Sequence, residues 1–195
     1  MTARVYISST FEDLREERQA VARALRRLGY SAAGMEDYVA SPRPPLTRCL
    51  EDVRGCKYFI GLYAWRLGDR PPGDARSFTQ LEYDEARRNG IPCLLFLLSA
   101  QAAWPTDKRD PDPEPMRRFR DTIQREQMVA TFSSMDQLDA ELTKAVVDLE
   151  RHETRAKYVG DLPVLLPYLA DRSEQEVHLA HLLEQHRHGE QQGSP

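Results

Sequence analysis

The chain has 195 residues, and its 41% hydrophobic and 30% charged residues exclude a collagen-like, rod-like or wholly disordered protein. The 27 basic and 31 acidic residues give a net charge of −4, which argues against a dedicated nucleic-acid-binding protein. No CxxC pair is formed by the three cysteines, Cys49, Cys56 and Cys93. We therefore expect no metal site and no disulfide framework, and we expect the protein to occupy a reducing compartment. The longest apolar-rich run, residues 91–100, is half the length that spans a bilayer, and no targeting segment is visible. We therefore expect a cytoplasmic protein with no membrane contact.

Short strand-like runs alternate with amphipathic helical runs along the chain. Residues 4–8 predict the first strand, and Ser9 and Thr10 have the capping-box spacing that predicts a helix running from there to about Leu28. Phe11 is expected on the apolar face of this helix, and residues 15–18 are expected to be mostly solvated.

The remaining elements follow from the same two periodicities. The sequence predicts strands at 30–35, 58–63, 92–98 and 128–132, helices at 45–54, 77–90, 116–127 and 135–151, and an exposed linker at 105–115.

This alternation predicts an α/β fold. Five βα units in one domain require parallel pairing, because crossovers of this length cannot join antiparallel neighbours. We therefore expect residues 1–151 to form a flavodoxin-like, doubly wound, five-stranded parallel sheet with helices on both faces, although the pattern leaves the strand order open. Residues 152–195 carry all five histidines and predict a linker and a helical tail, with its helix at about 173–187.

Ligands of an open parallel sheet bind outside the carboxyl ends of its strands, and this rule selects candidate site residues. The candidates are Ser8, Ser9, Thr10 and Phe11 after the first strand, Glu36 after the second, Tyr63, Trp65 and Arg66 after the third, and Ser77 and Glu82 at the start of the next helix. Hydroxyls, an aromatic wall, a guanidinium and carboxylates suit a nucleotide or a sugar phosphate. Each also has an ordinary structural role: capping for Ser9 and Thr10, packing for Tyr63 and Trp65, an ion pair for Arg66, and a solvated helix surface for Glu82. The absence of GxGxxG, GxxxxGK[ST] and GxSxG motifs argues against a dinucleotide fold, a P-loop ATPase and an α/β-hydrolase.

Four ordered segments within residues 3–100 carry a family likeness. RVYISSTFEDLREERQAVARAL, GMEDYVAS, YFIGLYAWRLG and SFTQLEYDEARRNGIPCLLFL closely resemble the domain of unknown function DUF4062, which is grouped with the TIR-like (Toll/interleukin-1 receptor-like) superfamily. The tail segment LPVLLPYLADRSEQE looks like the start of a STAND-type module of bacterial conflict and defence proteins. The resemblance implies a flavodoxin-like signalling domain whose partner is a second copy of itself or a larger STAND-type host protein.

TIR-like domains act as self-associating adaptors or as enzymes that cleave the nicotinamide–ribose bond of NAD⁺. The resemblance implies that Glu82, five residues past Ser77 and eight before Gly90, matches the catalytic glutamate of those enzymes, with Glu85 as the runner-up. The segment MEDYVASPRPP departs from a typical TIR BB loop, and the Trp-Cys pair of many TIR helices is absent. The near-neutral charge, the appended tail and the missing Trp-Cys pair favour a homotypic adaptor, with an NAD⁺ glycohydrolase as the alternative and a nucleotide-sensing domain as the third hypothesis. No cofactor is expected, and NAD⁺ is the expected substrate of the enzyme.

Overall fold

The computed structural model describes residues 2–34 and 45–155, so the candidate Glu36 and the predicted tail helix lie outside the described residues. The chain divides into two compact units, Met1–Val147 and Asp148–Pro195, and the first carries the α/β fold. In chain order the described elements are β1 (Arg4–Ser8), α1 (Arg15–Arg27), β2 (Ser31–Ala33), α2 (Pro45–Arg54), β3 (Tyr58–Tyr63), α3 (Phe78–Arg88), β4 (Cys93–Leu98), the 3-10 helix η2 (Thr106–Lys108), α4 (Glu114–Glu126) and β5 (Ala130–Phe132), and residues 135–155 are helical. None of the helices in these described ranges has the length and hydropathy to cross a membrane.

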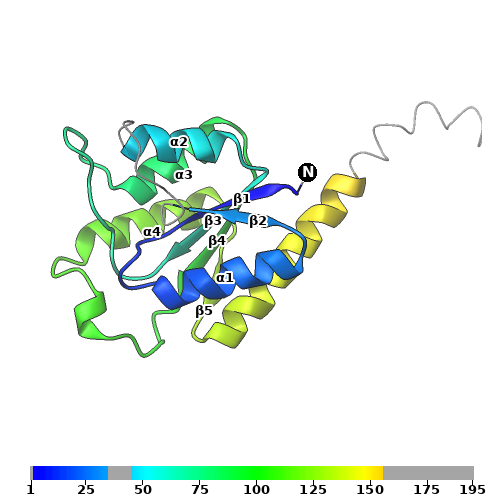
Figure 1. Cartoon of the computed structure of the whole chain (residues 1–195). Helices are drawn as coiled ribbons and strands as arrows, with labels where there is room; N and C mark the ends of the chain where they lie inside the picture. The colour runs from blue at the N-terminus through cyan, green and yellow to red at the C-terminus, as the bar shows by residue number, and fades with distance from the viewer. Residues whose placement is uncertain (1, 35–44, 156–195) are drawn as a thin grey trace, which may run out of the picture. The chain divides into compact units, whose positions relative to one another are not determined.

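The five strands form one parallel sheet in the order β2-β1-β3-β4-β5 (Figure 1). This is the flavodoxin strand order, and it confirms the predicted fold class. The chain leaves β1 toward one side of the sheet and returns to the other side at β3. The carboxyl ends of β1 and β3 therefore flank the point where ligands of such sheets bind.

Helices cover both faces of the sheet. On one face α2, α3 and α4 pack over a buried cluster that contains a row of aromatic rings from strands and helices. Neighbouring ring centroids in this row are 6.1 Å apart for Tyr6 and Phe59, 6.3 Å for Phe59 and Tyr83, and 6.1 Å for Tyr83 and Phe119. The other face is covered by α1 and the helical residues 135–147 (Figure 1). β3 is buried along its whole length, as expected for a strand covered on both faces.

The first helix begins later than predicted. α1 starts at Arg15, after a turn at residues 11–13, and no side chain caps it. The Ser9 hydroxyl is engaged elsewhere, because it donates to the Thr10 carbonyl and accepts a hydrogen bond of 2.8 Å from Arg18. The predicted capping box at Ser9 and Thr10 is therefore wrong.

The solvation of this segment also differs from the expectation. Phe11 lies before the helix and is 51% exposed, so it is not part of the apolar face. Glu17 and Arg18 are buried rather than solvated. The Arg18 guanidinium folds back onto the end of β1, where it donates to the Ile7 carbonyl over 3.2 Å. Helical periodicity alone predicts a surface position for this arginine. The hydrogen bond to a strand-end carbonyl instead keeps its side chain buried.

The other predicted boundaries agree closely with the structure. α2 and β3 coincide with the predicted ranges, and Ser77 caps α3 through a complete capping box with Gln80. Gly90 ends this helix region with a φ of +66°, a conformation that glycine adopts without strain. The linker predicted at 105–115 contains η2, and α4 begins within it at Glu114.

One buried arginine ties the carboxyl ends of two strands together. Arg120 of α4 donates to the carbonyls of Tyr63, the last residue of β3, and of Ala64, both over 3.1 Å, and to the Leu98 carbonyl of β4 over 2.7 Å. Its guanidinium also lies 4.2 Å from the centroid of the Trp65 ring. Desolvation lowers the pKa of Arg120 to about 10, which leaves the group charged at neutral pH.

We expect Arg120→Ala to lower the free energy of unfolding by about 3 kcal/mol, because it leaves strand-end carbonyls without their charged donor. Arg117→Ala is the matched control on the same helix, since Arg117 is exposed, and it should change stability by no more than about 0.5 kcal/mol. Urea denaturation of both variants measures this difference. Equal stability of the two would show that Arg120 does not hold the strand ends.

Candidate functional site

Glu82 of α3 lies buried against the carboxyl end of β1. Its side chain is enclosed, with 3% of the residue exposed, and both of its oxygens accept hydrogen bonds from one strand. The Tyr6 hydroxyl donates to Oε1 over 2.7 Å, and the Ser8 hydroxyl donates to Oε2 over 2.6 Å. The expectation that Glu82 lies on a solvated helix surface is therefore wrong. This carboxylate can be buried because two hydroxyl groups on β1 supply the hydrogen bonds that water would otherwise donate to it.

Burial determines the ionisation of Glu82. Desolvation raises its pKa above the ordinary value of 4.5, and the hydrogen bonds from Ser8 and Tyr6 offset part of this rise. The charge of Arg18 and the thiol of Cys49 lower the pKa further, by smaller amounts. Burial thus makes the charged form of this carboxyl group less favourable than in a solvated glutamate, and perturbed carboxyl groups of this kind are frequent at functional sites.

Glu85, the alternative candidate, has a different environment three residues further along the same helix. It accepts hydrogen bonds from Arg54 of α2, from Arg88 and from Asn89. Desolvation is the largest single influence on its pKa and raises it, but the hydrogen bonds and charges of these partners together lower it. Glu85 therefore joins α2 to α3 as an ionised group.

Two aromatic candidates lie at the carboxyl end of β3, Tyr63 as its last residue and Trp65 two residues later. Tyr63 is buried, with its ring in edge contact with Phe119 at 5.1 Å, and desolvation raises its pKa well above 10.0. Ser8 and Glu82 are among the groups that act on its hydroxyl, so Tyr63 belongs to the surroundings of the carboxylate. Trp65 is half-buried between two guanidinium groups, those of Arg109 at 5.5 Å and Arg120 at 4.2 Å.

The other predicted residues have partners of their own. Arg66 donates to Glu12 over 2.6 Å, and Ser77 is the buried cap of α3. The Thr10 methyl group lies against Gly68, where an added Cβ would come within 2.8 Å of it. The exposed Phe11 ring lies 5.3 Å from the Arg15 guanidinium. Of the predicted residues that the structure describes, three thus lie close enough to interact: Ser8, Tyr63 and Glu82.

Two residues of this cluster were not among the candidates. Tyr6 stands two positions before Ser8, and alternation along a strand puts both side chains on the same face. A hydroxyl at both of these positions, which alternate with the apolar Val5 and Ile7, is the signal that could have found Tyr6. Arg18 had no such signal, because its approach to β1 depends on where α1 begins.

A second pair of buried carboxyl groups lies at the start of α1. Asp13 is fully buried, and desolvation raises its pKa, as it does for Glu17. Lys108 donates to the Asp13 carbonyl over 3.1 Å and lowers the pKa of both carboxyl groups by a smaller amount. Within the described ranges no group of three or more His, Cys, Asp or Glu side chains could hold a metal ion.

The family model of the domain of unknown function DUF4062 matches residues 4–147. The chain belongs to the DUF4062 family. A comparison with curated proteins gave no match.

Several solved structures are similar to this chain, at low sequence identity and with TM-scores below 0.5. The RPS4 and RRS1 TIR domain heterodimer matches with a TM-score of 0.47 and 14% identity, over 74% of this chain and 95% of that chain. The Clostridium botulinum CMP N-glycosidase BcmB matches with a TM-score of 0.45 and 14% identity, over 71% and 96%. The 2-desoxiribosyltransferase of Leishmania mexicana matches with a TM-score of 0.39 and 14% identity, over 51% and 67%. These are likenesses alone, and nothing about the chemistry of the DUF4062 domain follows from them; its flavodoxin-like fold rests on its own strand order, β2-β1-β3-β4-β5.

The raised pKa of Glu82 predicts how a Glu82→Gln variant responds to pH. When folding raises the pKa of an acidic group, the free energy of unfolding of the protein falls as the pH rises through the folded-state pKa. A neutral amide at the same position causes no such fall. Relative to the parent protein, Glu82→Gln should therefore be most stabilised at neutral pH, and this advantage should shrink as the pH falls toward 4.5. Urea denaturation of both proteins between about pH 5 and 8 measures this difference in the free energy of unfolding. The contributions of Asp13 and Glu17 cancel in the difference because both proteins contain these residues.

Glu85→Gln is the matched control with the opposite sign. The pKa of Glu85 is lowered in the folded protein, so its charge stabilises the fold above 4.5 and that contribution is lost as the pH falls. Glu85→Gln should accordingly be destabilised at neutral pH. A pH-independent gap between Glu82→Gln and the parent protein would contradict a raised pKa for Glu82.

Proposed function

We propose that this DUF4062 domain hydrolyses an N-ribosyl bond, with NAD⁺ as its substrate and Glu82 as the catalytic carboxylate. The observation that carries the proposal is the burial of Glu82 between the hydroxyls of Tyr6 and Ser8 at the carboxyl end of β1. A buried carboxylate with a raised pKa costs folding stability, and a hydrophobic side chain of similar size would avoid that cost. Groups of this kind are concentrated at functional sites.

The chemistry explains why a carboxylate is suited to this position. When nicotinamide leaves with the bonding electrons, positive charge develops on C1′ and the ring oxygen of the ribose, and water then adds to C1′. A fixed anion beside the ribose stabilises this cation more strongly in an enclosed site than in water. Tyr6 and Ser8 restrain the two oxygens of Glu82, so the anion requires little rearrangement during the reaction.

The geometry also favours one direction of approach. Ser8 is the last residue of β1 and lies at the edge of the sheet, whereas Tyr6 is two residues deeper. Oε2 is the oxygen that accepts from this last residue of the strand. A ribose hydroxyl that enters from this edge can donate to Oε2 in place of Ser8, while Tyr6 continues to hold Oε1.

We expect Glu82→Gln to lower NAD⁺ turnover by at least about a hundredfold, because the amide carries no charge to stabilise the cation. Nicotinamide release is measured with the purified chain at high concentration and with a crowding agent that promotes assembly. Glu85→Gln is the control, and its turnover should stay near that of the parent protein when both are folded. Turnover that survives Glu82→Gln and disappears in Glu85→Gln would transfer the role to Glu85. No turnover by the folded parent protein under these conditions would contradict the proposal for the isolated chain.

The pH dependence of turnover is a second expected outcome. The cation is stabilised by the ionised form of Glu82, whose pKa is raised above 4.5 by desolvation. The rate should therefore fall on the acid side, with a midpoint above 4.5. A rate that stays constant down to pH 4.5 would show that ionised Glu82 is not required.

Homotypic assembly is the second candidate function, and one observation favours it. Phe11 is a large hydrophobic residue with 51% exposure, and it stands beside Arg15 at the carboxyl end of β1. Such a residue can anchor a second copy of the domain, brought close by a larger STAND-type host protein. The Phe11→Ser variant should then sediment as a smaller species than the parent protein at equal concentration. Met128, which is 96% exposed between α4 and β5, provides the control variant Met128→Ser.

A further inference from the structure

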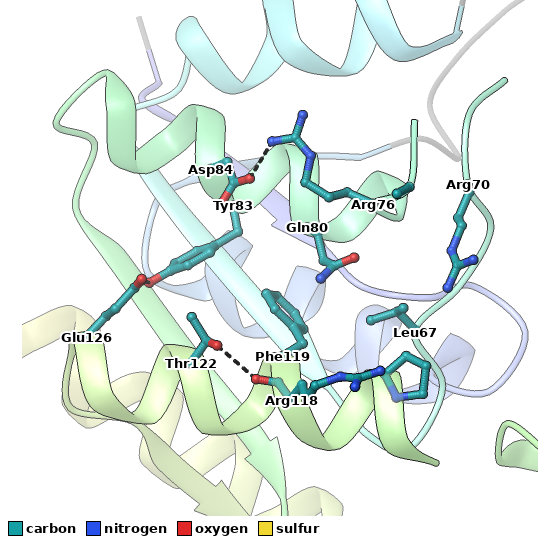
Figure 2. A pocket seen from close by; sticks show the side chains of 12 residues that line it. Leu67, Arg70, Arg76, Gln80, Tyr83, Asp84, Arg118, Phe119, Thr122 and Glu126 are labelled. Atoms are coloured by element: carbon teal, nitrogen blue, oxygen red, sulfur yellow. Dashed lines mark hydrogen bonds and ion pairs between the residues drawn. The ribbon is translucent and has the colours of Figure 1, made fainter. Parts of the chain in front are cut away.

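A cavity of about 340 Å³ lies between α3, α4 and the loop that precedes α3. Leu67, Tyr83 and Phe119 supply its apolar lining (Figure 2), and Glu82 is not among the residues that line it. A volume of this size is at the lower end of the range for small-molecule sites, which have an apolar lining and a few polar groups.

The polar groups of this cavity are distributed unequally between its two ends. Figure 2 shows Arg70 and Arg118 toward one end, Glu126 at the opposite end and Phe119 between them. Arg118 and Glu126 are eight residues apart on α4, which corresponds to about 12 Å along a helix. The cavity therefore has a cationic end and an anionic end at a distance that one small molecule can span.

The charges at these ends are available to a ligand. Arg76 is neutralised by Asp74 and Asp84, each at 2.9 Å, but neither Arg70 nor Arg118 forms an ion pair within residues 2–34 and 45–155. At the other end the Tyr83 hydroxyl donates to Oε2 of Glu126 over 2.9 Å. Oε1 of Glu126 has no donor among the described residues and can accept one from a ligand.

The direction of the helices strengthens this polarity. α3 and α4 each follow a strand of a parallel sheet, so their N-termini lie at the carboxyl edge. Arg118 is the fifth residue of α4 and lies in the half of the helix toward that edge, whereas Glu126 is its last residue. The cationic end of the cavity thus lies at the edge where parallel sheets bind phosphates.

We propose that this cavity binds a nucleoside monophosphate, with its phosphate at Arg70 and Arg118, its base against Phe119 and an exocyclic amine directed to Glu126. The three parts of the ligand match the three parts of the cavity: an anion, a flat apolar body and a hydrogen-bond donor. The site is separate from Glu82, and the proposal stands whether or not Glu82 is catalytic.

Isothermal titration calorimetry with adenosine 5′-monophosphate tests the proposal on the full chain. We expect saturable binding of one equivalent, and binding at least about tenfold weaker to Arg118→Glu, which replaces an attraction for phosphate by a repulsion. Arg117→Glu changes the charge equally on the same helix but lies outside the cavity, and it should bind within about twofold of the parent protein. Thr122→Trp, which fills the cavity from an exposed position, should also abolish binding.

Two further titrations separate the parts of the ligand and the two sites. Adenosine and inorganic phosphate should each bind at least about tenfold more weakly than the nucleotide, since each lacks one charged or apolar contact. Glu82→Gln should bind adenosine 5′-monophosphate as the parent protein does. The proposal is overturned if the nucleotide shows no saturable binding, if Arg117→Glu and Arg118→Glu lose binding equally, or if Glu82→Gln removes it.

Discussion

The position of α3 depends on the pair of hydrogen bonds that β1 donates to Glu82. A carboxylate can be buried only where donors replace its water, and here both donors come from alternate residues of one strand, Tyr6 and Ser8. This requirement limits how far α3 can slide along or rotate against the sheet, because either movement would leave a buried oxygen without a donor. α3 and β1 are thus coupled by a polar contact beside a cluster of apolar and aromatic side chains.

Two glutamates on α3 have opposite pKa shifts because their surroundings differ. Glu82 and Glu85 are both 3% exposed, yet the pKa of Glu82 is raised and that of Glu85 is lowered. The difference lies in their partners, since neutral hydroxyls hold Glu82 whereas Arg54 and Arg88 pair with Glu85. Two carboxyl groups with opposite shifts have different tasks. The ion-paired Glu85 joins α2 to α3, whereas Glu82 is the carboxylate to which the proposed function assigns stabilisation of a developing cation.

The sequence determined the fold far better than the site. Alternating periodicities predicted the parallel sheet and most boundaries, because burial on one or both faces dictates which positions are apolar. The predicted start of α1 was wrong, because the Ser9 hydroxyl that would cap the helix accepts a hydrogen bond from Arg18 instead. The burial of Glu82 was also missed, because a carboxylate on a helix is ordinarily solvated and its hydroxyl donors are more than seventy residues away in the chain. Contacts of that separation follow from strand order, which the pattern left open.

The two proposed sites lie on different faces of one short helix. Successive residues of a helix point in directions about 100° apart, so Glu82 turns toward β1 while Gln80, Tyr83 and Asp84 line the cavity beside α4. The row of rings from Tyr6 through Phe59 and Tyr83 to Phe119 joins the two regions by direct contact. Tyr6 holds Glu82 at one end of this row, and Phe119 lines the cavity at the other. The rings and α3 thus place the buried carboxylate and the cavity on one shared apolar support, while each site keeps its own set of polar groups.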